Sequence, residues 1–300
     1  MVKSNQTILL WLTSFLLAYF LSACGGSSDK IDAGSLSLNI TDAPIDGATE
    51  VVVQFSAIEI KPQQGDSLTI TFDTPQSIDL LALQNGNSHT LLQNEILDAG
   101  EYNWMRLAVD AVEGEMDSYI SFVDGSTHSL HVPSGNTTGL KLNRPFTIPA
   151  GGNASFTIDF DLRKSVHLPG NNGADYKLRP TLRIIDNTQV GNISGYIEAA
   201  LVADESCSEG LAVYAYAGTN ITPDDEGSNL SPLTSTIPSY DNDNNRYQYQ
   251  LSFLSVGDYT VAVTCDADLD DPEVDDDISF IVSDEAAVSE NQTSTLNFEA

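Results

Sequence analysis

Basic residues are scarce in this chain of 300 residues, which has 12 Lys and Arg against 43 Asp and Glu. The formal net charge is −31 at pH 7. So acidic a surface repels nucleic acid and anionic membranes, and it attracts cations or basic partners. Nucleic-acid binding is therefore excluded. High solubility in a salty environment and specific cation binding are two interpretations of the charge that both stay open.

Catalytic motifs are also absent. The sequence has no G-x-S-x-G elbow and no H-E-x-x-H zinc helix. His128 and His131, two of the four histidines, are three apart on a predicted strand, so their side chains point to opposite faces and cannot share a metal ion. We therefore predict a protein that is not an enzyme and has no catalytic residues. A hydrolase acting on an extracellular polymer is the alternative, because a pair of carboxylates suited to glycoside hydrolysis could lie among so many acidic residues.

No apolar run reaches the roughly 20 residues that a transmembrane helix needs. The run that comes nearest, Ile8–Phe20, follows a short segment with one Lys, as in a secretory signal peptide. The next residues, Leu21-Ser22-Ala23-Cys24, resemble the bacterial lipobox. This resemblance implies that residues 1–23 are removed and that Cys24 is acylated. Gly25 follows the cysteine, which in lipoproteins of Gram-negative bacteria implies sorting to the outer membrane.

The chain has three cysteines. If Cys24 carries lipid, Cys207 and Cys265 remain, and two cysteines in an exported protein most simply form one disulfide. Cys265 ends a predicted strand with its side chain toward the core, and Cys207 lies just before another predicted strand. Antiparallel neighbours bring the start of one strand to the end of the next, so this pairing is geometrically reasonable.

Alternation of apolar and polar residues dominates the chain after a Gly/Ser-rich segment at residues 24–34, which we interpret as a flexible tether. Such alternation predicts strands with one buried and one solvated face. Many short strands separated by Gly, Asn and Pro turns predict an all-β fold with antiparallel β-sandwiches. Nearly all basic residues precede residue 187, so we predict one sandwich at residues 35–187 and a second, more acidic one at residues 188–300. The strands expected in the first include 51–60 and 104–112, and those in the second include 193–201, 211–217, 247–254 and 259–265.

Several ordered motifs of the first sandwich resemble the bacterial domain-of-unknown-function family 4382. They are LNITDAP (38–44), DLL (79–81), AGEY (99–102), VPSG (132–135), GLK (139–141), DFDLRKSV (159–166) and YKLRP (176–180). The resemblance covers about residues 34–187 and implies an exported, often lipid-anchored protein with no established activity. The second sandwich is loosely similar to carboxypeptidase-regulatory and transthyretin-like domains, through ISGYI (193–197) and VGDYTV (256–261).

Charged residues near the end of the first sandwich form two groups. Asp159, Asp161 and Arg163 are expected on the polar face of one strand, and Lys177, Arg179 and Arg183 on that of another. Cross-strand ion pairing is the simpler interpretation of the two groups. An anion or sugar-acid site is the alternative.

One acidic segment has the composition of a metal site. Residues 266–277 carry closely spaced carboxylates in a loop that contains proline, and carboxylates are the hard oxygen donors that Ca²⁺ prefers. The spacing imitates the start of an EF-hand loop, but the sixth position lacks glycine and no flanking helices are expected. The predicted Ca²⁺ ligands are Asp266, Asp268, Asp270, Asp271 and Asp277; a solvated acidic loop is the alternative.

Taken together, these features predict a lipid-anchored lipoprotein of the bacterial outer membrane, facing the periplasm or the cell surface. It would act as a non-catalytic binding or envelope-associated module with an envelope or extracellular ligand, stabilised by Ca²⁺ if the acidic loop binds it. A structural spacer in the envelope is a further alternative.

Overall fold

The computed structural model describes residues 32–300, apart from 44, 46, 134–138 and 168–174. The predicted signal peptide, Cys24 and most of the predicted tether lie outside these residues. The strand β1 begins at Ala33, which pairs with Asp98 of β4, so the last two residues of the predicted tether belong to the first sheet.

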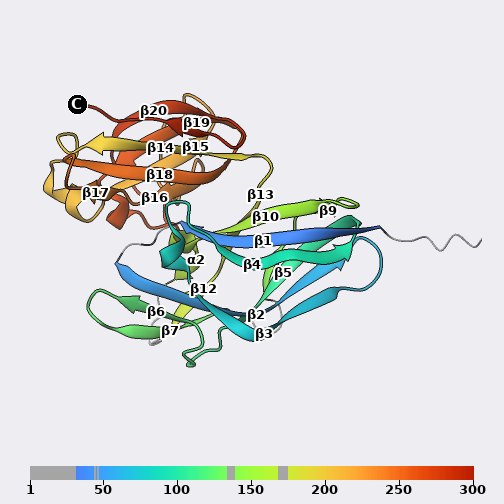
Figure 1. The fold of residues 1–300 in the computed structure, drawn as a ribbon. Helices are drawn as coiled ribbons and strands as arrows, with labels where there is room; N and C mark the ends of the chain where they lie inside the picture. The colour runs from blue at the N-terminus through green and yellow to red at the C-terminus, as the bar shows by residue number, and fades with distance from the viewer. Residues whose placement is uncertain (1–31, 44, 46, 134–138, 168–174) are drawn as a thin grey trace, which may run out of the picture. The chain divides into compact units, whose positions relative to one another are not determined.

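The described strands form four sheets, and those of residues 33–186 make up two of them (Figure 1). One is a four-stranded sheet in the order β13 (Thr181–Asp186), β10 (Asn153–Asp161), β1 (Ala33–Ala43) and β4 (His89–Asp98). The other has nine strands: β2 (Ala48–Pro62), β3 (Leu68–Asp79), β5 (Gly100–Asp110), β6 (Tyr119–Phe122), β7 (Thr127–His131), β8 (Leu140–Leu142), β9 (Phe146–Ile148), β11 (Val166–His167) and β12 (Tyr176–Leu178).

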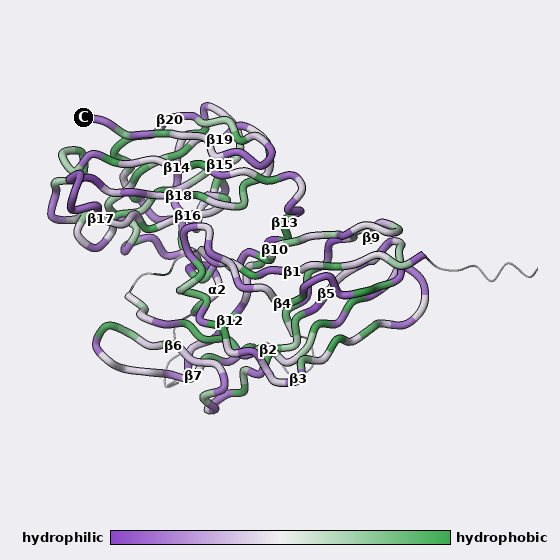
Figure 2. Tube along the Cα trace, in the orientation of Figure 1, coloured by the Kyte–Doolittle hydropathy of each residue, from purple (hydrophilic) through white to green (hydrophobic). Residues whose placement is uncertain are grey.

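Alternation of side chains explains why these two sheets pack face to face. Leu36, Leu38 and Ile40 of β1 are fully buried and belong to one hydrophobic core together with residues of β2 and β5 in the other sheet. Their neighbours in the sequence are polar and point away from this core. Figure 2 shows the resulting pattern, with hydrophobic colour along the strands and hydrophilic colour gathered in loops such as those around β17 (Ser239–Asp241).

The strands after residue 187 form the second sandwich, again from two sheets around one core. One sheet has the order β17 (Ser239–Asp241), β18 (Arg246–Ser255), β14 (Val190–Glu198) and β21 (Thr293–Thr295). The other has the order β16 (Thr234–Thr236), β15 (Ala212–Ala217), β19 (Gly257–Thr264) and β20 (Phe280–Val288). The all-β sandwich fold predicted from the sequence is thus confirmed.

The sheets are not purely antiparallel, which the alternation pattern could not reveal. β1 pairs with β10, β7 with β12 and β14 with β21 in parallel. Parallel pairing needs a long crossover, and each of these pairs joins strands that are well separated in the sequence. Short helices connect some strands: η1 (Leu80–Leu83), α2 (Leu162–Ser165), η2 (Glu205–Ser208) and η3 (Ala267–Leu269).

The predicted division at residues 187 and 188 falls in the turn between β13 and β14, where Gln189 donates a backbone hydrogen bond to Asp186. Residues Ala33–Ala300 nevertheless form one compact unit. Two independent domains therefore remain a prediction.

Candidate metal centre

Two long loops cover the outer face of the β16–β15–β19–β20 sheet. One connects β15 to β16 and the other connects β19 to β20. The side chains of β15 alternate, so Val213 and Ala215 enter the sandwich core, whereas Tyr214 and Tyr216 pack on the outer face beneath the loops. The hydroxyl of Tyr216 donates to the carbonyl of Asp224 in the first loop. The hydroxyl of Tyr214 donates to Asp270 in the second loop at 2.6 Å. The two tyrosine rings pack on the sheet, and their hydroxyl groups hold both loops against it.

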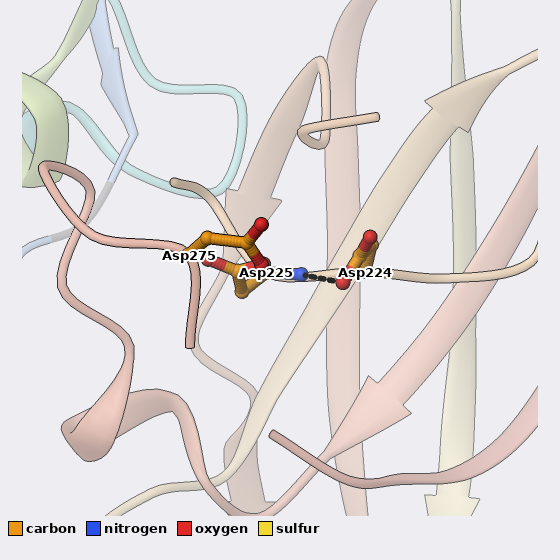
Figure 3. Close-up of side chains that lie close together, drawn as sticks. All are labelled: Asp224, Asp225 and Asp275. Carbon is orange, nitrogen blue, oxygen red and sulfur yellow. Dashed lines mark hydrogen bonds between the residues drawn. The ribbon is translucent and has the colours of Figure 1, made fainter. Parts of the chain in front are cut away.

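Carboxylates from the two loops meet in two overlapping groups. One oxygen each of Asp225, Asp270 and Asp276 lies within 4.8 Å of those of the other two residues, and the same holds for Asp224, Asp225 and Asp275. Figure 3 shows the second group, in which the carboxylates of Asp225 and Asp275 lie side by side. Asp225 belongs to both groups and is therefore the centre of the site.

The Asp225 side chain is fully buried, and its two oxygens are in different situations. Oδ2 accepts hydrogen bonds from the backbone N–H groups of Gly227 and Asp276, each at 3.0 Å. Oδ1 is buried and has no hydrogen-bond partner among the described residues. The side chain is thus held in place through one oxygen while the other lacks a donor.

Asp270 is 7% exposed and is held from two sides. Besides the Tyr214 hydroxyl, the backbone N–H of Glu226 donates to it, at 3.0 Å to Oδ1. Burial raises the pKa of Asp270, the hydrogen bonds from Tyr214 and Glu226 and the charge of Arg163 lower it in part, and the charge of Asp225 raises it further. Asp270 therefore lies where a negative charge is costly unless a cation is close.

Gly227 allows the two loops to approach each other. A Cβ atom at this position would lie 1.6 Å from the backbone oxygen of Val274 in the other loop, which no side chain could tolerate. The backbone contact places Asp225 beside Asp276, although 51 residues separate them in the sequence.

The structure distributes the predicted Ca²⁺ ligands differently from the sequence. Asp270 is in the first group, but Asp266, Asp268, Asp271 and Asp277 are in neither. Asp266 accepts a hydrogen bond from the backbone of Ser279 and so joins the two ends of the loop, whereas Asp271 accepts one from Glu273 and closes a local turn. Sequence reasoning missed Asp224 and Asp225, which lie far upstream; the acidic run Asp224-Asp225-Glu226 was the available signal.

The predicted disulfide is confirmed: Cys207 and Cys265 are bonded, with both side chains in the core of the second sandwich. Asp159 and Arg183 also pair as expected, with Nη2 and Oδ2 2.6 Å apart across β10 and β13. Arg163 does not lie on a strand face with them. It belongs to α2, because Asp161 caps that helix by accepting a hydrogen bond from the backbone of Lys164.

Residues 33–180 match the model of the family described as "Domain of unknown function (DUF4382)". The first sandwich is a DUF4382 domain. This match agrees with the resemblance of its sequence motifs. The matched residues include α2 and β12, and they do not include the candidate metal centre. No curated protein matches the chain. Within the described residues, no helix is long and apolar enough to cross a membrane.

Several solved structures show a weak similarity. The minor pilin of Streptococcus agalactiae is 12% identical, with a TM-score of 0.19, and the match covers 88% of this chain and 94% of the pilin. A fimbrial protein of Bacteroides ovatus is 10% identical, with a TM-score of 0.21 and coverage of 89% and 49%. The major pilin subunit of Bacillus cereus is 11% identical, with a TM-score of 0.19 and coverage of 89% and 99%. At these scores the similarity carries no information about function.

Proposed function

We propose that this protein is a non-catalytic binding module of the bacterial cell envelope, anchored by lipid on Cys24 at the outer membrane. The observation that carries the proposal is the buried Cys207–Cys265 disulfide. Structural disulfides persist in oxidising compartments outside the cytoplasm. The lipobox-like residues before Cys24 and the signal-like apolar run support the same location.

The binding role rests on the surface and on the architecture. The net charge of −31 favours cations or basic groups on a partner. Two sandwiches, with loops held by their sheets, form a scaffold on which binding residues are commonly placed. We therefore expect the ligand to be an extracellular or envelope component with positive charge.

The anchor is tested with Cys24→Ser in the full-length protein. Without a thiol to acylate, the protein should leave the membrane fraction or accumulate as the uncleaved precursor, and its mass should lack the acyl chains. Ser27→Ala in the same segment is the matched control and should keep the membrane fraction and mass of the wild type. Unchanged mass and membrane retention of Cys24→Ser would overturn the proposal. Cross-linking in intact cells, followed by purification of the wild type, then identifies the partner.

A further inference from the structure

We propose that the second sandwich binds one Ca²⁺ ion through the carboxylates of Asp225, Asp270 and Asp276. Ca²⁺ binds oxygen ligands at about 2.3–2.6 Å, so two ligands of one ion lie at most about 5 Å apart. The three carboxylates meet this condition, with one oxygen of each within 4.8 Å of the others. They come from two loops, so one ion would connect the β15–β16 loop to the β19–β20 loop.

The buried oxygen of Asp225 is the independent observation that indicates a ligand. A buried carboxylate oxygen without a donor is costly, because it has lost its water and gained nothing in return. Oδ1 of Asp225 is in this state, whereas Oδ2 receives two backbone N–H groups. Those two hydrogen bonds fix the orientation of the carboxylate before any ion arrives. A cation at Oδ1 would supply the missing interaction.

The local charge balance also favours a cation, because few basic residues reach the two loops. Arg246 is the one basic residue after position 187 in the sequence, and it lies on β18 near Asp241 rather than at the loops. Arg163 approaches Glu226 and Tyr214 and offsets the charge of Asp270 only in part. Arg179 and His167 pair with Glu273 of the second loop, which is in neither carboxylate group. Three carboxylates with oxygens within 4.8 Å of one another repel, and a divalent ion would convert this repulsion into coordination.

The donor set favours Ca²⁺ over other metals. The two groups contain carboxylates and neither His nor Cys, which disfavours Zn²⁺ and Cu²⁺. Mg²⁺ demands a compact octahedron and keeps much of its water, whereas Ca²⁺ accepts six to eight oxygens in irregular geometry. Asp224 and Asp275 form the second group around Asp225 and stand at the more exposed side, where they and water can complete such a shell. The affinity should be that of extracellular modules, with a Kd of about 10⁻⁴–10⁻³ M.

The test is binding of Ca²⁺ and of Tb³⁺, a luminescent substitute for Ca²⁺, to the detergent-solubilised, processed protein. Tyr214 donates to Asp270, so a Tb³⁺ ion bound there should emit when tyrosine is excited, and millimolar CaCl₂ should quench the emission by displacement. At constant ionic strength, CaCl₂ should also raise the melting temperature relative to EDTA, and MgCl₂ should raise it much less.

Asp225→Asn and Asp276→Asn should each abolish the Tb³⁺ emission and the rise in melting temperature. The second variant alters the less buried residue, so it keeps the test valid if Asp225→Asn fails to fold. Asp277→Asn is the matched control, since it removes the same charge from an exposed neighbour outside both groups, and it should bind Ca²⁺ as the wild type does.

Three results would overturn the proposal. The first is an equal melting temperature in EDTA and CaCl₂ together with no Tb³⁺ emission. The second is an equal loss of binding in Asp277→Asn and Asp276→Asn, which would indicate a diffuse ion atmosphere. The third is normal binding by Asp225→Asn with loss in Asp268→Asn, which would place the ion in the 266–277 loop alone.

Discussion

Asp159 is a buried carboxylate whose pair with Arg183 does not fully offset the cost of burial. It is 8% exposed, and Arg183 donates to its Oδ2 from both Nε and Nη2. Burial raises the pKa of Asp159 and outweighs Arg183, which lowers it. The folded state therefore binds this proton more tightly than the unfolded state, where the pKa is about 3.9. Its stabilising contribution is complete below that pH and is lost as the pH rises through the folded pKa.

The unfolding free energy of the wild type should fall between pH 3.5 and pH 7 as Asp159 loses its proton. We predict that this fall is smaller in Asp159→Asn. The variant loses its ion pair with Arg183, so its stability at each pH also changes, and the difference between the two pH values is the quantity to compare. Denaturant unfolding at both pH values measures it. Asp73→Asn, at an exposed position on β3, should keep the pH dependence of the wild type. An identical pH dependence in Asp159→Asn would contradict the assignment.

The sequence predicted the partner of a residue correctly where only one pairing was possible or where the partner lay on a neighbouring strand. The two remaining cysteines could pair in one way, and Asp159 opposes Arg183 once the strands are assigned. The candidate ligands were predicted incompletely, because density of charge along the chain does not reveal which carboxylates are buried. Asp225 joins Asp276 through a loop contact that depends on the missing side chain of Gly227.

At the scale of elements, most strands follow from alternation, but changes of sheet do not. Arg179 and Arg183 were expected on one strand, yet Arg179 directly follows β12 of the nine-stranded sheet and Arg183 lies on β13 of the four-stranded one. Pro180 separates them, and because proline cannot donate to a ladder it suits the point where the chain leaves one sheet. Parallel partners such as β1 and β10 depend on the whole topology, so local periodicity cannot give them.

The Cys207–Cys265 disulfide links η2 to the end of β19 across 58 residues of sequence. Closing a loop of that length stabilises by about 4 kcal/mol in the chain-entropy model. We predict that Cys207→Ala combined with Cys265→Ala lowers the unfolding free energy of the second sandwich by roughly 2–4 kcal/mol. Denaturant unfolding measures this, and the wild type in reductant should behave like the variant. Free thiols in the unreduced native protein, detected by alkylation and mass spectrometry, would contradict the pairing.

At the scale of the whole molecule, Arg163 connects the DUF4382 domain to the acidic second sandwich. Its side chain is 4% exposed, and its Nη1 atom lies 4.0 Å from Oε1 of Glu226, itself 2% exposed. Nη1 also donates to the Tyr214 hydroxyl, and the guanidinium lies 5.7 Å from the centre of that ring. Burial raises the pKa of Glu226 to about 8, and Arg163 is the strongest influence that lowers it. A cation from one sandwich thus favours the charged form of a buried carboxyl group of the other, beside the candidate metal centre, and this group is mostly ionised only above its pKa of about 8.

We predict that Arg163→Met costs about 3–5 kcal/mol of unfolding free energy at pH 9, above the pKa of Glu226, because it leaves the Glu226 carboxylate buried without its counter-charge. Glu226→Gln in the same background should recover much of that loss, since replacing both members of a buried pair is far less costly than removing one. Denaturant unfolding of the wild type, both single variants and the double variant gives the coupling energy, expected at about 0.5–3 kcal/mol. Lys164→Met, which removes the neighbouring charge, should cost less, because Lys164 is more exposed than Arg163; it pairs with Asp161 and donates to the carbonyl of Pro232. Additive costs for Arg163→Met and Glu226→Gln would mean that the two sandwiches are joined without this ion pair. A coupling within the expected range would mean that the acidic sandwich depends on a cation from the DUF4382 domain for part of its stability.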